Sequence, residues 1–113
     1  MNEAQKKYAP GGIFNFPIYP GNATSQKWRK KFSNFVIPNL IAFQPDFILI
    51  SAGFDAHEKD FIHDSKDTRV TEFEYQWLTN QIMTVANKFC EGRVISVLEG
   101  GYHTRSGPIS PLA

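Results

Sequence analysis

Apolar side chains recur every three or four residues along residues 25–43, and this spacing predicts a helix with one apolar stripe. The stripe consists of Trp28, Phe32, Phe35, Val36, Leu40 and Phe43. Thr24 or Ser25 can cap the helix, because a hydroxyl oxygen accepts a hydrogen bond from an amide of the first turn. Pro38 should kink the helix or split it in two, because proline lacks an amide hydrogen and its ring crowds the preceding turn.

The same spacing returns along residues 72–90 and predicts a second, longer helix. Its apolar positions are Phe73, Trp77, Leu78, Ile82, Val85, Ala86 and Phe89. Thr71 and Glu74 have the three-residue spacing of a capping box, in which the two residues satisfy each other's free amides at the helix start. Gly92 is typical of the residue that follows a helix end, because glycine adopts a positive φ without strain.

Two continuous apolar runs, residues 47–50 and residues 94–98, are typical of strands buried on both faces of a parallel sheet covered by helices. Residues 13–19 are also rich in strand formers, but Pro17 restricts them to an edge strand or an extended segment. The order of the main elements is helix, strand, helix, strand. The chain is therefore predicted to have an α/β fold with a parallel sheet and flanking helices.

Polar residues follow both predicted inner strands, at the edge where ligands bind in open α/β sheets. Asp55 comes after the first strand, and Tyr102 comes after the second. A carboxylate there can hold a metal ion, and a phenol can donate a hydrogen bond to a developing oxyanion. An aspartate after a strand is equally typical of a turn or a helix cap, and Gly-Gly-Tyr is often a plain turn. The residues alone therefore support a metal site or a polar-ligand site.

Two histidines, His57 and His63, lie in a charged loop, where solvent exposure is the expected state. The Asp55-x-His57 spacing could contribute two ligands to a metal site, although zinc normally takes three or four protein ligands. The single cysteine, Cys90, excludes a disulfide framework and a cysteine-based zinc cluster. Its place in the apolar pattern predicts a small buried side chain.

The composition is that of a single small globular domain. The chain has 113 residues, 42% hydrophobic and 20% charged, and its net charge of +1 indicates no nucleic-acid-binding surface. The basic cluster within residues 27–31 is best interpreted as a solvated helix face. There is no apolar run of signal-peptide or membrane-spanning type. We therefore expect a soluble protein of the nucleus or cytoplasm that contacts neither nucleic acid nor a membrane.

Two long motifs resemble signatures of one enzyme family. Residues 45–57, PDFILISAGFDAH, closely resemble a segment of the zinc-dependent histone deacetylases, in the class II-like branch. Residues 92–102, GRVISVLEGGY, resemble the second signature of that family. The family shares its fold with arginase and with the acetylpolyamine amidohydrolases. The resemblance implies an incomplete arginase/deacetylase-type domain over residues 12–113. Residues 1–11 are polar and lead into a Pro-Gly-Gly sequence, so we expect a flexible lead-in there.

The resemblance also implies roles for individual residues. Asp55 matches the aspartate that binds the catalytic zinc, and Tyr102 matches the tyrosine that donates a hydrogen bond to the acetyl carbonyl and then to the oxyanion. Gly100 and Gly101 match glycines that let the acetyl-lysine channel pass close to the backbone. Ile62 matches an apolar residue of the pocket rim, where the family often has Gly-Asp-Pro-Leu and this chain has the sequence KDFI over residues 59–62. This departure puts the shape of the rim, and hence the substrate preference, in question.

The position of His57 is not a zinc ligand in the family, so the resemblance argues against the Asp-x-His interpretation. The other two zinc ligands of the family come from an upstream Asp-x-His motif, and its paired histidines also lie upstream. No His-His pair occurs in this sequence. We therefore expect the C-terminal part of a catalytic domain, cut at both ends, which neither retains zinc nor deacetylates by itself.

The leading functional hypothesis is a lysine deacetylase that hydrolyses acetyl-lysine in histones or other proteins, within a corepressor-type complex. One alternative is an amidohydrolase of the acetylpolyamine type. A second alternative is a non-catalytic fragment that binds a partner or self-associates through exposed apolar residues such as Phe14, Phe16 and Phe35.

Overall fold

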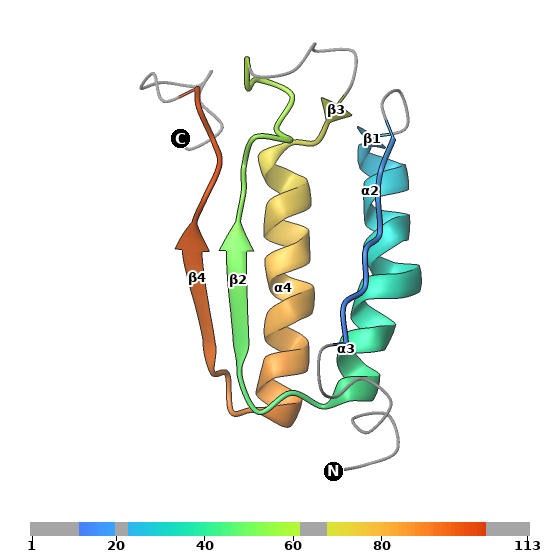
Figure 1. The fold of residues 1–113 in the computed structure, drawn as a ribbon, viewed down its shortest axis with the longest axis vertical. Coiled ribbons are helices and arrows are strands. Elements are labelled where there is room, and N and C mark those ends of the chain that lie inside the picture. The colour runs from blue at the N-terminus through green and yellow to red at the C-terminus, as the bar shows by residue number, and fades with distance from the viewer. Residues whose placement is uncertain (1–11, 20–22, 62–67, 104–113) are drawn as a thin grey trace.

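The computed structural model describes residues 12–19, 23–61 and 68–103, and Figure 1 shows the arrangement of their elements. In chain order these are β1 (Ala23–Thr24), α2 (Ser25–Lys31), the π-helix η1 (Phe32–Val36), α3 (Ile37–Phe43), β2 (Ile48–Ala52), β3 (Thr68–Arg69), α4 (Glu72–Phe89) and β4 (Val94–Leu98). The flexible lead-in expected over residues 1–11 lies outside the described residues. The α/β class predicted from the sequence is confirmed.

The central feature of the fold is the parallel pair of strands β2 and β4. Ile48 lies opposite Val94, and the register continues to Ala52 opposite Leu98. Figure 1 shows α4 beside β2, with α2 and α3 beyond α4. Because α4 connects two parallel neighbours, β2, α4 and β4 form the βαβ unit expected from the order of elements.

Helices α2 and α3 are joined through η1 into one continuous helical run over residues 25–43, with a π-helical turn before Pro38. The Thr24 hydroxyl accepts a hydrogen bond from the amide of Lys27 at 3.3 Å and caps α2. Pro38 lies in the first turn of α3, where its missing amide hydrogen costs least. The wider π-helical turn of η1 directly precedes it, as expected where the regular hydrogen-bond ladder is interrupted. Pro38 therefore coincides with a change of the hydrogen-bond pattern, but the helical run over residues 25–43 is not split.

Helix α4 begins with the predicted capping box. The Glu74 carboxylate accepts hydrogen bonds from the Thr71 amide at 2.9 Å and from the Thr71 hydroxyl. The guanidinium of Arg29 in α2 lies 3.1 Å from the same carboxylate, so Glu74 also ties α2 to α4. Burial raises the pKa of Glu74, but the hydrogen bonds from Thr71 and Arg29 outweigh it and hold the pKa below its ordinary value. Gly92, just beyond the helix, has φ +72°, which glycine adopts without strain.

The core lies between α4 and one face of the sheet. Ile48, Ala86 and Cys90 are buried there, as predicted for Cys90, and Leu40, Ile50, Ile82 and Val94 pack around them. The opposite face carries Leu49, Ile95 and Val97, whose exposed fractions are 65%, 51% and 47%. The prediction of strands buried on both faces is therefore wrong for the described residues. The physical reason is that α4 and α3 cover only one face, while the strand sequences are apolar on both.

Residues 12–19 form neither helix nor strand, so the strand alternative for residues 13–19 is wrong and the extended segment remains. This segment runs along α2 and α3 (Figure 1), and the Phe16 ring stacks on Phe35 with a centroid separation of 5.8 Å. The short parallel pair of β1 and β3, with Ala23 opposite Thr68, was not predicted. Within the described ranges, no helix is long and apolar enough to cross a membrane.

Candidate active site

The two segments that carry the candidate residues meet at the carboxyl edge of the sheet. The amide of Glu99 donates to the carbonyl of Ala52 at 3.0 Å, and the amide of Phe54 donates to the carbonyl of Gly100 at 2.8 Å. These two bonds continue the pairing of β2 and β4 beyond the strand ends. They bring the loop that carries Asp55 and the loop that carries Tyr102 to one edge, as the sequence predicted.

The Asp55 carboxylate lies against two glycines, one from each loop. A Cβ atom on Gly100 would lie 2.5 Å from Oδ1 of Asp55 and 2.8 Å from its Cγ, and a Cβ atom on Gly53 would lie 2.9 Å from the same Oδ1. Real Cβ atoms essentially never approach another atom this closely. Gly53 and Gly100, called the glycine cradle below, therefore leave the space that the carboxylate occupies. The family resemblance assigned Gly100 to the substrate channel. It did not indicate that Gly100 and Gly53 lie against the Asp55 carboxylate.

Tyr102 is attached to the site through its backbone. Its amide donates a hydrogen bond to Oδ2 of Asp60 at 2.7 Å, and the amide of His103 donates to the same oxygen at 3.3 Å. The Tyr102 side chain is 49% exposed, whereas Asp60 is 3% exposed. Gly101, immediately before Tyr102, has φ +133°, a conformation that favours glycine. Sequence reasoning missed Asp60, although an aspartate in the loop after β2 is close enough along the chain to reach this edge.

His57 is not exposed to solvent, contrary to the expectation from its charged loop. It is 1% exposed, and its backbone forms a bridge with Val70. Its Nδ1 accepts a hydrogen bond from the amide of Lys59 at 3.1 Å, so the ring proton is on Nε2, which donates to Glu72 at 3.1 Å. A backbone hydrogen bond and the contact with His57 hold the pKa of Glu72 below its ordinary value. His57 therefore orders the loop after β2 and is not placed as a metal ligand.

Tyr75 of α4 provides a second phenol near the two aspartates. Its ring packs against Phe54 and His57, with centroid separations of 5.0 and 6.4 Å. Its hydroxyl is buried and has no hydrogen-bond partner within the described residues. Burial raises its pKa strongly, and the negative charges of Asp55 and Asp60 raise it further. The hydroxyl therefore stays protonated.

The described residues do not contain a complete set of zinc ligands. Zinc takes three protein ligands in catalytic sites and four in structural ones. The described ranges contain no group of three His, Cys, Asp or Glu side chains able to surround a metal ion. The Asp55 carboxylate in its glycine cradle fits the contribution of one oxygen ligand. Two further predicted residues, Ile62 and His63, lie outside the described residues.

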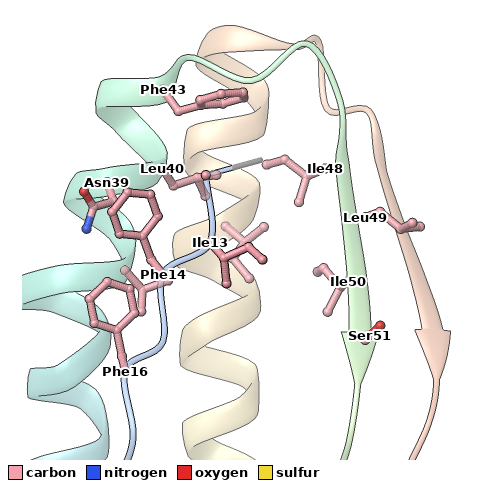
Figure 2. A pocket seen from close by; sticks show the side chains of 13 residues that line it. Ile13, Phe14, Phe16, Asn39, Leu40, Phe43, Ile48, Leu49, Ile50 and Ser51 are labelled. Atoms are coloured by element: carbon pink, nitrogen blue, oxygen red, sulfur yellow. The ribbon is translucent and has the colours of Figure 1, made fainter. Parts of the chain in front are cut away.

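A separate apolar cavity of about 1000 Å³ lies between residues 12–16, α3 and β2. Figure 2 shows Ile13, Phe14 and Phe16 between the helix and the strand, on the side of β2 toward which Ile48 and Ile50 point. Its lining contains no titratable side chain, and the polar ones are those of Asn39 and Ser51. The cavity does not include Asp55 or Tyr102. The cavity therefore offers no side chain for acid–base or metal chemistry, whereas the carboxyl edge of the sheet carries Asp55 and Tyr102.

Comparison with known proteins gives a consistent result. Residues 1–110 match the model of the histone deacetylase domain. The chain is 41% identical over 92 residues to type-2 histone deacetylase 2 of Dictyostelium discoideum, a match that covers 81% of this chain and 5% of that protein. It is 34% identical over 106 residues to the chloroplastic histone deacetylase 14 of Arabidopsis thaliana, covering 94% of this chain and 24% of that protein.

The match extends to an archaeal protein and to a solved structure. A probable deacetylase of Archaeoglobus fulgidus is 34% identical over 110 residues, a match that covers 91% of this chain and 30% of that protein. The crystal structure of the HDA15 HD domain superimposes with a TM-score of 0.67 at 33% identity, covering 83% of this chain and 26% of that one. The chain thus spans less than a third of the length of these relatives. With the domain match over nearly all of its residues, the chain belongs to the histone deacetylase family.

Proposed function

We propose that this chain supplies part of the active site of a zinc-dependent lysine deacetylase. In this proposal Asp55 is one of the zinc ligands, and Tyr102 donates the hydrogen bond that stabilises the oxyanion. The observation that carries the proposal is the pairing of the two loops beyond β2 and β4, which sets the cradled Asp55 carboxylate and Tyr102 at one edge of the sheet. The substrate is acetyl-lysine in a histone or another protein.

The reaction is the hydrolysis of an amide, in which water adds to the acetyl carbonyl and the lysine amine leaves. Zinc, when bound, polarises that carbonyl and activates the water. Tyr102 donates its phenolic proton in a hydrogen bond to the oxygen that gains negative charge. A donor of this type contributes about 2.7–4 kcal/mol to transition-state stabilisation. Its half-exposed side chain leaves the phenol accessible to a substrate.

Asp55 by itself would bind zinc weakly, because a catalytic zinc site needs three protein ligands and a lone carboxylate supplies only one. We therefore propose that the 113-residue chain, taken alone, neither retains zinc nor turns over acetyl-lysine. In the full-length protein the remaining ligands would come from outside these residues.

The test is a deacetylase assay on an acetyl-lysine peptide, comparing the full-length protein with its Tyr102→Phe and Asp55→Asn variants. Tyr102→Phe should lower kcat by about 100- to 1000-fold with zinc content unchanged, because only the oxyanion donor is lost. Asp55→Asn should lower zinc affinity, measured by competition with a chelator. Unchanged turnover in the first variant or unchanged zinc affinity in the second would remove that residue from its assigned role.

The same assay distinguishes the protein substrate from an acetylpolyamine. A lysine deacetylase should have the higher kcat/KM on the acetyl-lysine peptide. Preference for acetylpolyamine would reassign the substrate class but leave the roles of Asp55 and Tyr102 unchanged. The 113-residue chain belongs in this assay as a third sample, and activity there would contradict our account of an incomplete metal site.

A second candidate function is binding without catalysis, and the bare face of the sheet favours it. The exposed apolar side chains of this face include Leu49, Ile95 and Val97. They form one apolar surface, because Leu49 pairs with Ile95 and Val97 follows two positions later on the same face of β4. Such a surface is typical of a protein contact. Light scattering of the 113-residue chain at low and high concentration tests this function. A clean monomer at both concentrations would argue against an interaction module that self-associates.

A further inference from the structure

The carboxylate of Asp60 holds the backbone of the loop that carries Tyr102. One oxygen, Oδ2, accepts the amide hydrogens of both Tyr102 and His103, at 2.7 and 3.3 Å. Asp60 is 3% exposed, so these bonds are largely shielded from competing water. Hydrogen bonds to an ionised acceptor are about twice as strong as neutral ones. The contact joins residues 42 positions apart and is therefore a tertiary anchor.

This anchor lies where the Tyr102 loop needs one. Gly100 and Gly101 precede Tyr102, and glycine restricts the backbone less than any other residue. On one side, the bond from the Phe54 amide to the Gly100 carbonyl fixes the start of the loop. On the other side, Asp60 fixes the amide of Tyr102 itself. The position of the Tyr102 Cα atom therefore depends on the Asp60 carboxylate.

Asp60 is in turn held by the loop that follows β2. Its amide donates to the carbonyl of His57 at 2.9 Å. His57 is buried against Val70 and bonded to Glu72 at the start of α4. A continuous set of contacts thus runs from α4 through His57 and Asp60 to Tyr102. A rigid helix end is a suitable support for a group that must be placed accurately.

We infer that Asp60 is a positioning residue for Tyr102, setting the location of its phenol without touching the substrate. This inference rests on the proposed function, in which Tyr102 is the oxyanion donor. A donor displaced by about 1 Å can lose roughly 10²-fold in rate. Loss of the Asp60 carboxylate should therefore act on turnover through Tyr102, and substrate binding should change little.

The experiment uses the full-length protein with Asp60→Ala, Asp60→Asn and the double variant Asp60→Ala with Tyr102→Phe. Glu58→Ala is the matched control, because it removes an exposed carboxylate from the same loop. Asp60→Ala should lower kcat by about 10- to 100-fold with KM within about twofold. Asp60→Asn keeps a side-chain oxygen as acceptor and should lose less. If Asp60→Ala does not fold, the kcat of Asp60→Asn is measured in its place.

Two further measurements separate positioning from a general loss of structure. Hydrogen exchange at the amides of Tyr102 and His103 should be about 10- to 100-fold faster in Asp60→Ala, with the amides of α4 unchanged. In the Tyr102→Phe background, Asp60→Ala should lower kcat little further, because the group through which it acts is already removed.

The outcomes are distinct. Wild-type kcat in Asp60→Ala, unchanged exchange at Tyr102 and His103, or an equal loss of rate in both Tyr102 backgrounds would each overturn the role of Asp60. A wild-type protein without deacetylase activity would overturn the proposed function, and with it the catalytic meaning of the anchor. In that case faster exchange would still identify Asp60 as the anchor of the loop.

Discussion

Replacing Gly100 with alanine would put a methyl group where the Asp55 carboxylate lies. The added Cβ would be 2.5 Å from Oδ1, 2.8 Å from Cγ and 3.3 Å from Oδ2. Gly100 is not among the glycines with positive φ, so alanine can adopt its backbone conformation. The substitution therefore changes the space beside Asp55 and little else. This makes it a direct test of the glycine cradle.

The size of the effect follows from these distances. Ordinary contact begins at 3.4 Å, so Oδ1 must move by 0.9 Å, from 2.5 Å to 3.4 Å. Overpacking of this kind typically costs about 1–3 kcal/mol, partly offset by about 0.4–1 kcal/mol from the stiffer unfolded chain. The net loss of stability is therefore modest. A reacting group moved by about 1 Å can lose roughly 10²-fold in rate, so activity should fall much more than stability.

The assay compares Gly100→Ala with Gly53→Ala in the full-length protein. The Gly53 variant is the graded control, because its Cβ would be 2.9 Å from Oδ1 and requires a shift of 0.5 Å. We expect zinc affinity and kcat/KM to fall in both variants, with Gly100→Ala the more severe. Wild-type zinc affinity and turnover in Gly100→Ala would refute the reasoning, because the carboxylate then cannot occupy the cradle.

Two further predictions concern buried polar groups of α4 in the 113-residue chain. Glu74→Gln should lower the free energy of unfolding at pH 7 by about 1–2 kcal/mol, because it removes the charge that Thr71 and Arg29 stabilise. The Arg29 side chain is 40% exposed, so solvent screens the ion pair and keeps the loss within this range. Because the pKa of Glu74 is lowered in the fold, its contribution is present above the ordinary value of 4.5 and is lost as pH falls through the folded value. The difference in urea midpoint between the wild type and Glu74→Gln should therefore be smaller at pH 3 than at pH 7. An equal difference at both pH values would contradict this. Glu91→Gln is the control, because it removes a carboxylate from an exposed ion pair. Tyr75→Phe should leave stability unchanged or raise it by up to about 1 kcal/mol, because its buried hydroxyl has no partner within the described residues. A loss above about 1 kcal/mol would indicate that the hydroxyl is bonded.

The sequence was sufficient for the elements whose signals are local. The helical spacing of residues 72–90 predicted α4, and the capping box at Thr71 and Glu74 is present. Pro38 predicted an irregularity in the first helix, and the π-helical turn η1 lies directly before it, because proline acts on the preceding turn. The two apolar runs predicted β2 and β4, and the parallel pairing followed from the helix between them. From this, Asp55 and Tyr102 could be placed at one edge of the sheet.

Only the tertiary structure decided which side chains support those two residues. The sequence indicated exposure for His57, but contacts with Val70 and Glu72, well separated along the chain, bury it. Asp60 reaches Tyr102 across 42 positions, and Gly100 reaches Asp55 through the pairing of two loops. The apolar strands likewise predicted two covered faces, whereas the described helices cover one.

The physical reason for this division lies in the range of the interactions. Helix spacing, caps and proline effects act within a turn or two, so the sequence by itself determined the main helices and strands, their order and the edge where the site lies. A glycine cradle or an aspartate that binds a distant amide exists only once two strands have paired and aligned their loops. The tertiary structure therefore decided what holds the Asp55 carboxylate and the Tyr102 backbone in place.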